Sequence, residues 1–276
     1  MRNSGRLFIK ITLLICLFVF IPAAYVFAGD WKTVDDSSWC DEKTFYFEKS
    51  VCEVREITIN ERWNDLIVEG SPNGVTEIEG WDKDSIFIQA KVEAKAGSKD
   101  ESEDLMSEVE LTADSGRIKA EGPRDTFSKK YWSVSYRIKA PVTANLELDS
   151  VNGGVIVKNI QGEIEAKTVN GGIILEDISG DVNARTVNGG IVAELDDKKW
   201  NRKEFEASTT NGGIKLVIPE DCSARLEANT NNGGINIDFP ITIKGRIKKS
   251  VNTTLGDGGG DINLRTMNGG IIISKR

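Results

Sequence analysis

The triplet Asn-Gly-Gly occurs six times in the second half of this chain, and it constrains the fold more than any other feature. The first three triplets are 18 residues apart, the next two steps are 23 and 21 residues, and the last is 36, or twice 18. A fixed period with a glycine corner is typical of repeat proteins built from stacked coils. The triplets begin at Asn152, Asn170, Asn188, Asn211, Asn232 and Asn268.

The residues that flank the triplets alternate between two chemical classes. The second, fourth and sixth residues before each Asn, and the third and fifth after it, are Ser, Thr, Ala or larger apolar residues. The positions between them often carry charged side chains, for example Glu165, Lys167 and Arg185. A period of two predicts strands with one buried face, because successive side chains of a strand point in opposite directions.

Two interpretations of the triplet fit this pattern. Asn-Gly favours positions that need a positive φ, so each triplet could be the turn of an antiparallel hairpin. Alternatively, each triplet is the corner of a coil, and equivalent residues stack in parallel ladders about 4.8 Å apart. Identical residue types at equivalent positions favour the coil, because Ile, Ala and Thr side chains then lie beside their own kind.

Energetics also favours stacking. The three or four inward aliphatic residues of one coil contribute ~1.5–3 kcal/mol each, whereas ordering the backbone costs ~1–2 kcal/mol per residue. The sequence therefore predicts an all-β protein, a β-solenoid of coils of about 18 residues with Asn-Gly-Gly corners. We expect an N-terminal β-rich cap and one short helix within Ser98–Glu110, where Leu105, Met106 and Val109 have helical spacing.

Four segments are expected along the chain. Residues 1–28 form a signal peptide, residues 29–54 an aromatic leader, residues 55–140 the N-terminal β-rich part and residues 141–276 the solenoid repeats. The signal peptide is predicted from its positive start, its apolar run and a small-residue cleavage site. An uncleaved membrane anchor is the alternative for this segment, although Pro22 interrupts the apolar run. The mature chain is expected to be exported, to the periplasm, the cell surface or the medium, and to carry no transmembrane span.

Three cysteines remain after the signal peptide. In an exported protein we expect a disulfide between Cys40 and Cys52, fixing a short hairpin that contains Phe45, Tyr46 and Phe47. Two buried free thiols are the alternative. Cys222 is then unpaired, and we interpret it as a shielded small residue.

Composition narrows the chemistry. The chain has no histidine, which excludes His-based nucleophile activation, His metal sites and His pH switches. Its formal net charge of −8 disfavours nucleic acid as a partner. The carboxylates are scattered over outward positions, and we expect no cofactor. The segment Gly256–Asp261 resembles a calcium-binding repeat but occurs once, so a structural turn is the preferred interpretation.

Apolar residues also occupy outward positions beside the first three corners. If the coils stack, these residues form two apolar columns, and contiguous exposed apolar area usually marks a contact surface. The alternative is that the predicted helix covers them. The columns comprise Val151, Val169 and Val187 before the glycines, and Ile156, Ile174 and Val192 after them.

Two further features concern the C-terminal part. Lys244, Arg246, Lys248 and Lys249 form the one local reversal of the acidic balance, either a binding loop or a solvated excursion. The chain ends in an apolar strand, Ile271–Ser274, and an unprotected terminal strand would allow self-association through this C-terminal edge.

The run from about Ile57 to the C-terminus resembles the bacterial putative adhesin domain family. The resemblance rests on the serial Thr-x-Asn-Gly-Gly-Ile steps, the Phe239–Ile243 strand, the glycine-rich Leu255–Asp261 segment and the final Asn268–Ile271. It implies an exported or envelope-associated β-solenoid, and the family supplies no catalytic signature to carry over.

Three functions are therefore considered. The first is a non-enzymatic exported envelope protein, an adhesin or surface-interaction module that binds an unknown protein or glycan at the cell envelope. The second is a periplasmic structural or signalling accessory that binds a membrane-protein partner. The third is a carbohydrate-active enzyme, since polysaccharide-cleaving enzymes also occur on stacked-coil folds.

Overall fold

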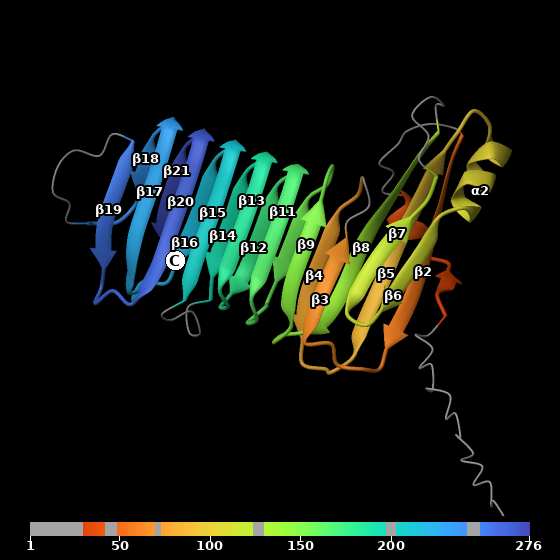
Figure 1. Ribbon diagram of the computed structural model, residues 1–276, viewed down its shortest axis with the longest axis horizontal. Helices are drawn as coiled ribbons and strands as arrows, with labels where there is room; N and C mark the ends of the chain where they lie inside the picture. The colour runs from red at the N-terminus through yellow and green to blue at the C-terminus, as the bar shows by residue number, and fades with distance from the viewer. Residues whose placement is uncertain (1–29, 42–48, 70–72, 124–129, 197–202, 242–248) are drawn as a thin grey trace, which may run out of the picture.

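The computed structural model describes residues 30–41, 49–69, 73–123, 130–196, 203–241 and 249–276 (Figure 1). The predicted signal peptide, the Phe45–Phe47 segment and most of the basic segment lie outside these residues. Within them the protein is all-β. Two large sheets face each other and both run along one long axis, and two short helices lie at the N-terminal end. One helix was predicted, and the second is a single turn in the leader.

Sheet A has eleven strands and sheet B has ten. In spatial order, sheet A contains β1 (Lys32–Val34), β2 (Ser50–Ile59), β5 (Ile86–Lys95), β8 (Tyr131–Pro141), β4 (Thr76–Trp81), β10 (Val155–Lys158), β12 (Ile173–Ile178), β14 (Ile191–Leu195), β16 (Ile214–Ile218), β21 (Ile271–Lys275) and β18 (Ile235–Ile237). Sheet B contains β19 (Ser250–Leu255), β17 (Ala224–Asn232), β20 (Gly260–Asn268), β15 (Glu204–Asn211), β13 (Val182–Asn188), β11 (Ile164–Asn170), β9 (Asn145–Ser150), β3 (Asp65–Glu69), β7 (Arg117–Glu121) and β6 (Glu110–Asp114).

The repeats pair in parallel and in the register of the triplets. Between β11 and β13, Ala166 lies beside Ala184 and Asn170 beside Asn188. The chain enters each corner from sheet B and leaves it in sheet A, as β11 and β12 do on either side of Asn170. This parallel pairing contradicts the antiparallel hairpin interpretation. The fold is a solenoid-like repeat.

The core lies between the two sheets and follows the predicted alternation. The inward alanines and isoleucines of successive rungs are fully buried, as Ala166, Ala184, Ile173 and Ile191 are at 0% exposure. Each ladder brings an apolar side chain to the same depth, although its size varies from rung to rung, as in the ladder of Leu146, Ile164, Val182 and Phe205. Each fully buried aliphatic side chain contributes ~1.5–3 kcal/mol, so the stability grows with the number of stacked rungs.

The order of the C-terminal strands differs from the order of the sequence. β20 pairs with β15 on one side and β17 on the other, and β21 lies between β16 and β18. The last coil is therefore inserted before the coil that precedes it in the chain. β19 then pairs antiparallel with β17 and ends sheet B. The prediction of an unprotected C-terminal strand is wrong, because β21 is hydrogen-bonded on both edges, and β18 and β19 are the edge strands at this end.

The N-terminal end is closed by α2 (Lys99–Ser107), within the predicted helical segment. Ser98 is the N-cap, and its side chain accepts a hydrogen bond from the backbone N–H of Glu101 at 3.2 Å. Arg55 donates to the carbonyl oxygens of Val109 and Met106 at 2.7 and 3.3 Å, which fixes the helix C-terminus to β2. Parallel stacking already begins before residue 141, since β3 and β4 pair with β9 and β10.

One prediction concerns the core beside this cap. Tyr136 on β8 is 1% exposed, and its hydroxyl has no hydrogen-bond partner among the protein atoms. A buried hydroxyl without a partner costs ~1–3 kcal/mol. We therefore expect Tyr136→Phe to raise the free energy of unfolding by about 1 kcal/mol, measured by chemical denaturation. An unchanged or lower stability would show that the hydroxyl is hydrogen-bonded in solution, for instance to an internal water.

Candidate interaction surface along the coil corners

The corner asparagines form a continuous amide ladder. The Nδ2 atom of each Asn donates to Oδ1 of the Asn on the neighbouring rung, for example from Asn170 to Asn152 at 2.7 Å and from Asn188 to Asn170 at 2.8 Å. Asn73, outside the triplets, accepts from Asn152 at 3.1 Å and extends the ladder by one rung. The remaining bonds run from Asn211 to Asn188, from Asn268 to Asn211 and from Asn232 to Asn268.

The threonines two residues before the Asn fix the same corner from inside. Thr168 is 4% exposed and donates from Oγ1 to the carbonyl of Gly153 at 3.0 Å, and Thr186 donates likewise to Gly171 at 2.9 Å. Each threonine thus binds the backbone of the preceding rung. The buried hydroxyls are satisfied, and the rungs are linked at the corner.

The two glycines of each triplet have different roles. A Cβ atom on Gly171 would lie 2.0 Å from the carbonyl oxygen of Gly153, whereas one on Gly172 would lie 3.4 Å from the oxygen of Gly190. No glycine of the triplets has a positive φ. The expectation that the triplet supplies positive φ is therefore wrong: the first glycine is needed because adjacent rungs approach too closely for a side chain. The second glycine has room for a methyl group in four triplets, at Gly154, Gly172, Gly234 and Gly270. A Cβ atom on Gly190 or Gly213 would lie 3.3 or 3.2 Å from a carbonyl oxygen of the next rung, which is a tight contact.

The two predicted apolar columns are present and lie at solvent. Val155 to Lys158 pair with Ile173 to Glu176, so Ile156 lies beside Ile174, and Ile174 lies beside Val192. Val151, Val169, Val187 and Val192 are 49%, 41%, 42% and 42% exposed, and Ile156 and Ile174 are half-buried. We call these six side chains, with the Asn and glycines between them, the corner face. It wraps around the edge of the stack, because the column of Val151, Val169 and Val187 lies on the sheet B side and the column of Ile156, Ile174 and Val192 on the sheet A side.

The helix does not cover the corner face. α2 packs on β5 and β2, where Leu105 and Met106 are buried, and Figure 1 shows it at the N-terminal end of the stack. The predicted cover by the helix is therefore wrong. All exposed large hydrophobic side chains of the described residues follow the corner edge: the four valines above and Val75, Met267 and Ile272 on neighbouring rungs.

The leader is attached to the outer side of sheet A by the predicted disulfide. Cys40 and Cys52 are bonded, which confirms the pairing, although Cys40 lies on the single-turn helix α1 (Ser37–Asp41) and Cys52 on β2 rather than in one hairpin. β1 continues the attachment by pairing antiparallel with β2. Asp36 caps α1 by accepting from the backbone N–H of Trp39 at 3.3 Å.

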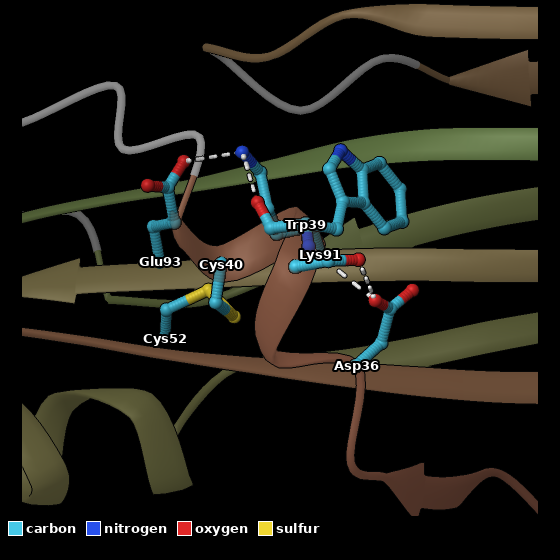
Figure 2. Close-up of a disulfide and its surroundings, with 7 residues drawn as sticks. Asp36, Trp39, Cys40, Cys52, Lys91 and Glu93 are labelled. Carbon is cyan, nitrogen blue, oxygen red and sulfur yellow. Dashed lines mark hydrogen bonds and ion pairs between the residues drawn. A yellow bond between two sulfur atoms is a disulfide. The ribbon is translucent and has the colours of Figure 1, made fainter.

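Beneath the leader lies a buried ion pair that the sequence did not indicate. Figure 2 shows Lys91 between Glu93 and the leader: its Nζ atom is 3.7 Å from Glu93 and donates to the carbonyl of Trp39 at 3.4 Å. The Trp39 ring also lies 4.1 Å from the Arg137 guanidinium. Lys91 and Glu93 are outward residues of an alternating strand, and the leader contacts this ion pair through Trp39. The order of residues along one strand carries no signal for such a cover.

Cys222 gives a prediction about reactivity. Its side chain is 7% exposed, and burial raises the pKa of the thiol to about 11 from an ordinary value of 9.0. At pH 8 about one molecule in a thousand is then a thiolate, so we expect a thiol reagent to modify the folded chain far more slowly than the urea-unfolded chain. Because the folded pKa is raised, the stabilisation from the bound proton is complete below pH 9 and is lost between pH 9 and 11. Equal reaction rates in both states would contradict this burial.

A groove on the outer face of sheet B is acidic. It has a volume of about 620 Å³. Three of its carboxylates have cationic partners outside the groove: Glu165 binds Lys167, Asp181 binds Lys203 and Glu206 binds Arg185. In the parts of the chain that the structure describes, no three Cys, Asp or Glu side chains come together as metal ligands. The acidic lining comprises Asp65, Glu147, Glu163, Glu165, Asp181, Glu204 and Glu206.

These features define a class: a solenoid-like repeat scaffold with a regular, apolar and uncharged corner face. The Toastrack DUF4097 family model matches residues 89–274, and the chain belongs to this family. The match agrees with the resemblance to adhesin domains seen in the sequence. A search of curated proteins found no match to the chain. Within the described residues, no helix is long and apolar enough to cross a membrane.

Several solved structures align with the chain at low identity. A "putative cell adhesion protein" from Clostridium sporogenes aligns over 83% of this chain and 100% of its own, with 12% identity and a TM-score of 0.46. A "putative adhesin" from Bacteroides fragilis covers 83% and 98%, with 11% identity and a TM-score of 0.33. A "putative lipid binding protein" from Parabacteroides distasonis covers 82% and 96%, with 14% identity and a TM-score of 0.27.

Proposed function

We propose that this chain is a non-enzymatic, exported and envelope-associated β-solenoid that acts as an adhesin-type interaction module. Its coils of about 18 residues with Asn-Gly-Gly corners form a rigid scaffold, and the corner face is the surface that binds. Export is supported by the signal-like segment 1–28 and by the Cys40–Cys52 disulfide, since disulfides persist in oxidising compartments.

The observation that carries the proposal is the gathering of exposed apolar side chains along one edge. Scattered surface hydrophobics are normal, but a contiguous set marks a contact site. The next rung, formed by β15 and β16, shows that the fold does not require these apolar residues. Lys215 occupies the position of Ile174 on the β16 rung, and Thr210 occupies the position of Val169. The apolar residues are therefore best explained by binding.

The test is binding to envelope material. The purified chain is incubated with envelope extract and with a glycan array, and compared with Val169→Lys and with the matched control Asn231→Lys, which makes the same column basic on the β17 rung near the C-terminal end of the stack. We expect the wild type and the control to bind and Val169→Lys to lose at least about nine-tenths of the binding, as for a residue at an interface centre. Binding by none of the three, or equally by all three, would refute the proposal.

Location separates this function from its main alternative. Protease added to intact cells digests a protein displayed at the surface but not a periplasmic accessory. We expect the protease added to intact cells to digest this protein. Protection until the outer barrier is opened would favour the periplasmic accessory that binds a membrane-protein partner.

A further inference from the structure

We propose that the edge strand β19 pairs with β19 of a second copy of this chain, antiparallel and about a two-fold axis at Asn252, so that sheet B continues from one copy into the other. Figure 1 shows β19 at the end of the stack opposite to α2, away from the corner face. The inference therefore goes beyond the proposed function and does not depend on it.

One edge of β19 has no partner strand. Thr230 of β17 donates from its backbone N–H to the carbonyl oxygen of Lys249 at 2.8 Å, so the backbone groups of Lys249 face β17. In an antiparallel pair these groups alternate between the two edges of a strand. Every second residue after Lys249 therefore also faces β17, and the residues between them point away, to a side on which no described strand lies. The residues that point away are Ser250, Asn252 and Thr254.

The other sheet edges carry features that prevent strand addition. In sheet A the end strands β1 and β18 are only three residues long, and Pro240 follows β18 closely. In sheet B the end strand β6 carries exposed Glu110 and Asp114 at its two ends. Short edge strands, charges and proline are the means by which natural sheets avoid edge-to-edge association. β19 has six residues and neither a charge nor a proline, so it lacks all three of these features.

The order of residues in β19 is complementary to itself. A two-fold axis at Asn252 places this residue beside Asn252 of the second copy, and Ser250 beside Thr254 of the second copy. Because the backbone groups of these residues all point to the free edge, this register forms about six backbone hydrogen bonds. A shift by one residue would place them opposite groups that already bind β17.

The side chains agree with the same register. Ser250, Asn252 and Thr254 are all exposed on the outer face of sheet B. The axis therefore places amide beside amide and hydroxyl beside hydroxyl, and such pairs hydrogen-bond across strands. No charged side chain of β19 meets a like charge, because the strand carries none.

Charge favours joining two copies end to end. The chain has a formal net charge of −8, and two elongated copies joined at β19 keep most of their carboxylates farther apart than copies lying side by side. Head-to-tail addition would instead place β19 on β6, whose Glu110 and Asp114 find no basic side chain within β19. The two-fold arrangement uses β19 of both copies and therefore stops at a dimer.

The length of β19 predicts a weak dimer. Six paired residues extend over about 20 Å, and one strand pair buries less than the about 800 Å² per partner of a standard interface. We expect a dissociation constant in the micromolar to millimolar range. Added salt should strengthen the dimer, because screening reduces the repulsion between two acidic copies.

Sedimentation equilibrium of the purified chain up to roughly 1 mM tests the pairing. We expect a monomer–dimer equilibrium that Asn252→Lys and Asn252→Pro each weaken at least about ten-fold. The lysine would face its own copy across the axis, and the proline removes the central N–H of the free edge at a position where sheets tolerate it. The matched control is Thr112→Lys, the same change at an exposed residue in the middle of β6, which should leave the equilibrium unchanged. Circular dichroism checks that each variant is folded.

A mixture of two variants tests the identity of the partner and the position of the axis. Asn252→Lys and Asn252→Asp should each be largely monomeric alone, whereas their mixture should form a dimer, because lysine then lies beside aspartate. Hydrogen exchange of the wild type gives a second readout. The amides of Ser250, Asn252 and Thr254 should gain protection as the concentration rises, whereas that of Val251 is already bonded to β17.

Three results would overturn the proposal. The first is a wild type that remains monomeric up to roughly 1 mM, and the second is a dimer that tolerates both Asn252→Lys and Asn252→Pro. The third is growth beyond a dimer together with sensitivity to Thr112→Lys, which would show head-to-tail addition. Absence of a dimer in the mixture would refute the axis at Asn252. Because β19 lies outside the corner face, Asn252→Lys should bind envelope extract as the wild type does, so the proposed function is tested separately.

Discussion

Replacing Gly171 by alanine is expected to lower the free energy of unfolding by about 3 kcal/mol, the upper end of typical overpacking costs. The added methyl group would lie 2.0 Å from the carbonyl oxygen of Gly153 on the neighbouring rung. That oxygen belongs to the backbone and also accepts the Thr168 hydroxyl hydrogen bond. Two rungs would have to separate, and ladder bonds on both sides of the corner would lengthen.

The matched control is the adjacent residue. At Gly172 the methyl group would lie 3.4 Å from the nearest atom, an ordinary contact, and φ is not positive. We expect Gly172→Ala to change stability by less than about 1 kcal/mol, and to raise it if anything, because alanine restricts the unfolded chain. Chemical denaturation measures the free energy of unfolding of both variants, and the two values can be compared if its dependence on denaturant concentration is unchanged. Equal destabilisation at the two positions would show that the close approach of the Gly153 carbonyl oxygen is not the reason for glycine at position 171.

The pair also separates folding from binding at one corner. If the corner face binds envelope material, Gly172→Ala should weaken that binding while leaving the fold intact. Gly171→Ala should instead lower the free energy of unfolding. Binding and stability therefore change in different variants, although the two glycines are neighbours in the sequence.

Much of the fold follows from the triplets and their frame. Equivalent residues such as Ala166 and Ala184 could be predicted to stack, because an alternating pattern with a fixed period leaves one arrangement that buries every inward side chain. The buried inward residues and the outward charged residues follow from the same alternation. The amide ladder and the apolar columns are visible in the sequence for this reason.

The order of the last coils could not be predicted in this way. β17 and β20 carry the same alternating pattern, so either could stack on β15 with apolar residues and a threonine at the inward positions. What separates the two orders is β19, which pairs antiparallel with β17 and ends the sheet. Residues 250–255 show no triplet, and the pairing partner of an isolated strand is a long-range property. The sequence period therefore fixes the register but not the order of the rungs.

The position of the leader over sheet A is another long-range property. Lys91 and Glu93 alternate with inward residues of β5, as solvent-exposed residues do, yet both are buried. The cysteine spacing indicated the covalent link, but not the surface on which α1 would lie. Trp39 is 5% exposed and contacts Lys91 of β5 and Arg137 of β8, which are distant from it in the sequence.

Loss of the disulfide is the second large effect that we expect. Cys40 and Cys52 are 12 residues apart, and a loop of this size is stabilised by about 3 kcal/mol through restriction of the unfolded chain. Among the described contacts, the leader of Cys40→Ser keeps the three residues of β1, the packing of Trp31 and the contacts of Trp39. We therefore expect local release of residues 30–41 at lower denaturant than the unfolding of the stack.

Hydrogen exchange distinguishes local release from global unfolding. In Cys40→Ser, or after reduction of the wild type, the amides of β1 and α1 should lose protection, whereas those of β11 and β13 should keep it. Cys222→Ser is the matched control, because it removes the remaining described thiol without touching the leader. Release would also remove the contacts of Trp39 with Lys91 and so increase the exposure of the Lys91–Glu93 pair. Unchanged protection of β1 after reduction would show that packing of Trp39, rather than the covalent bond, holds the leader in place.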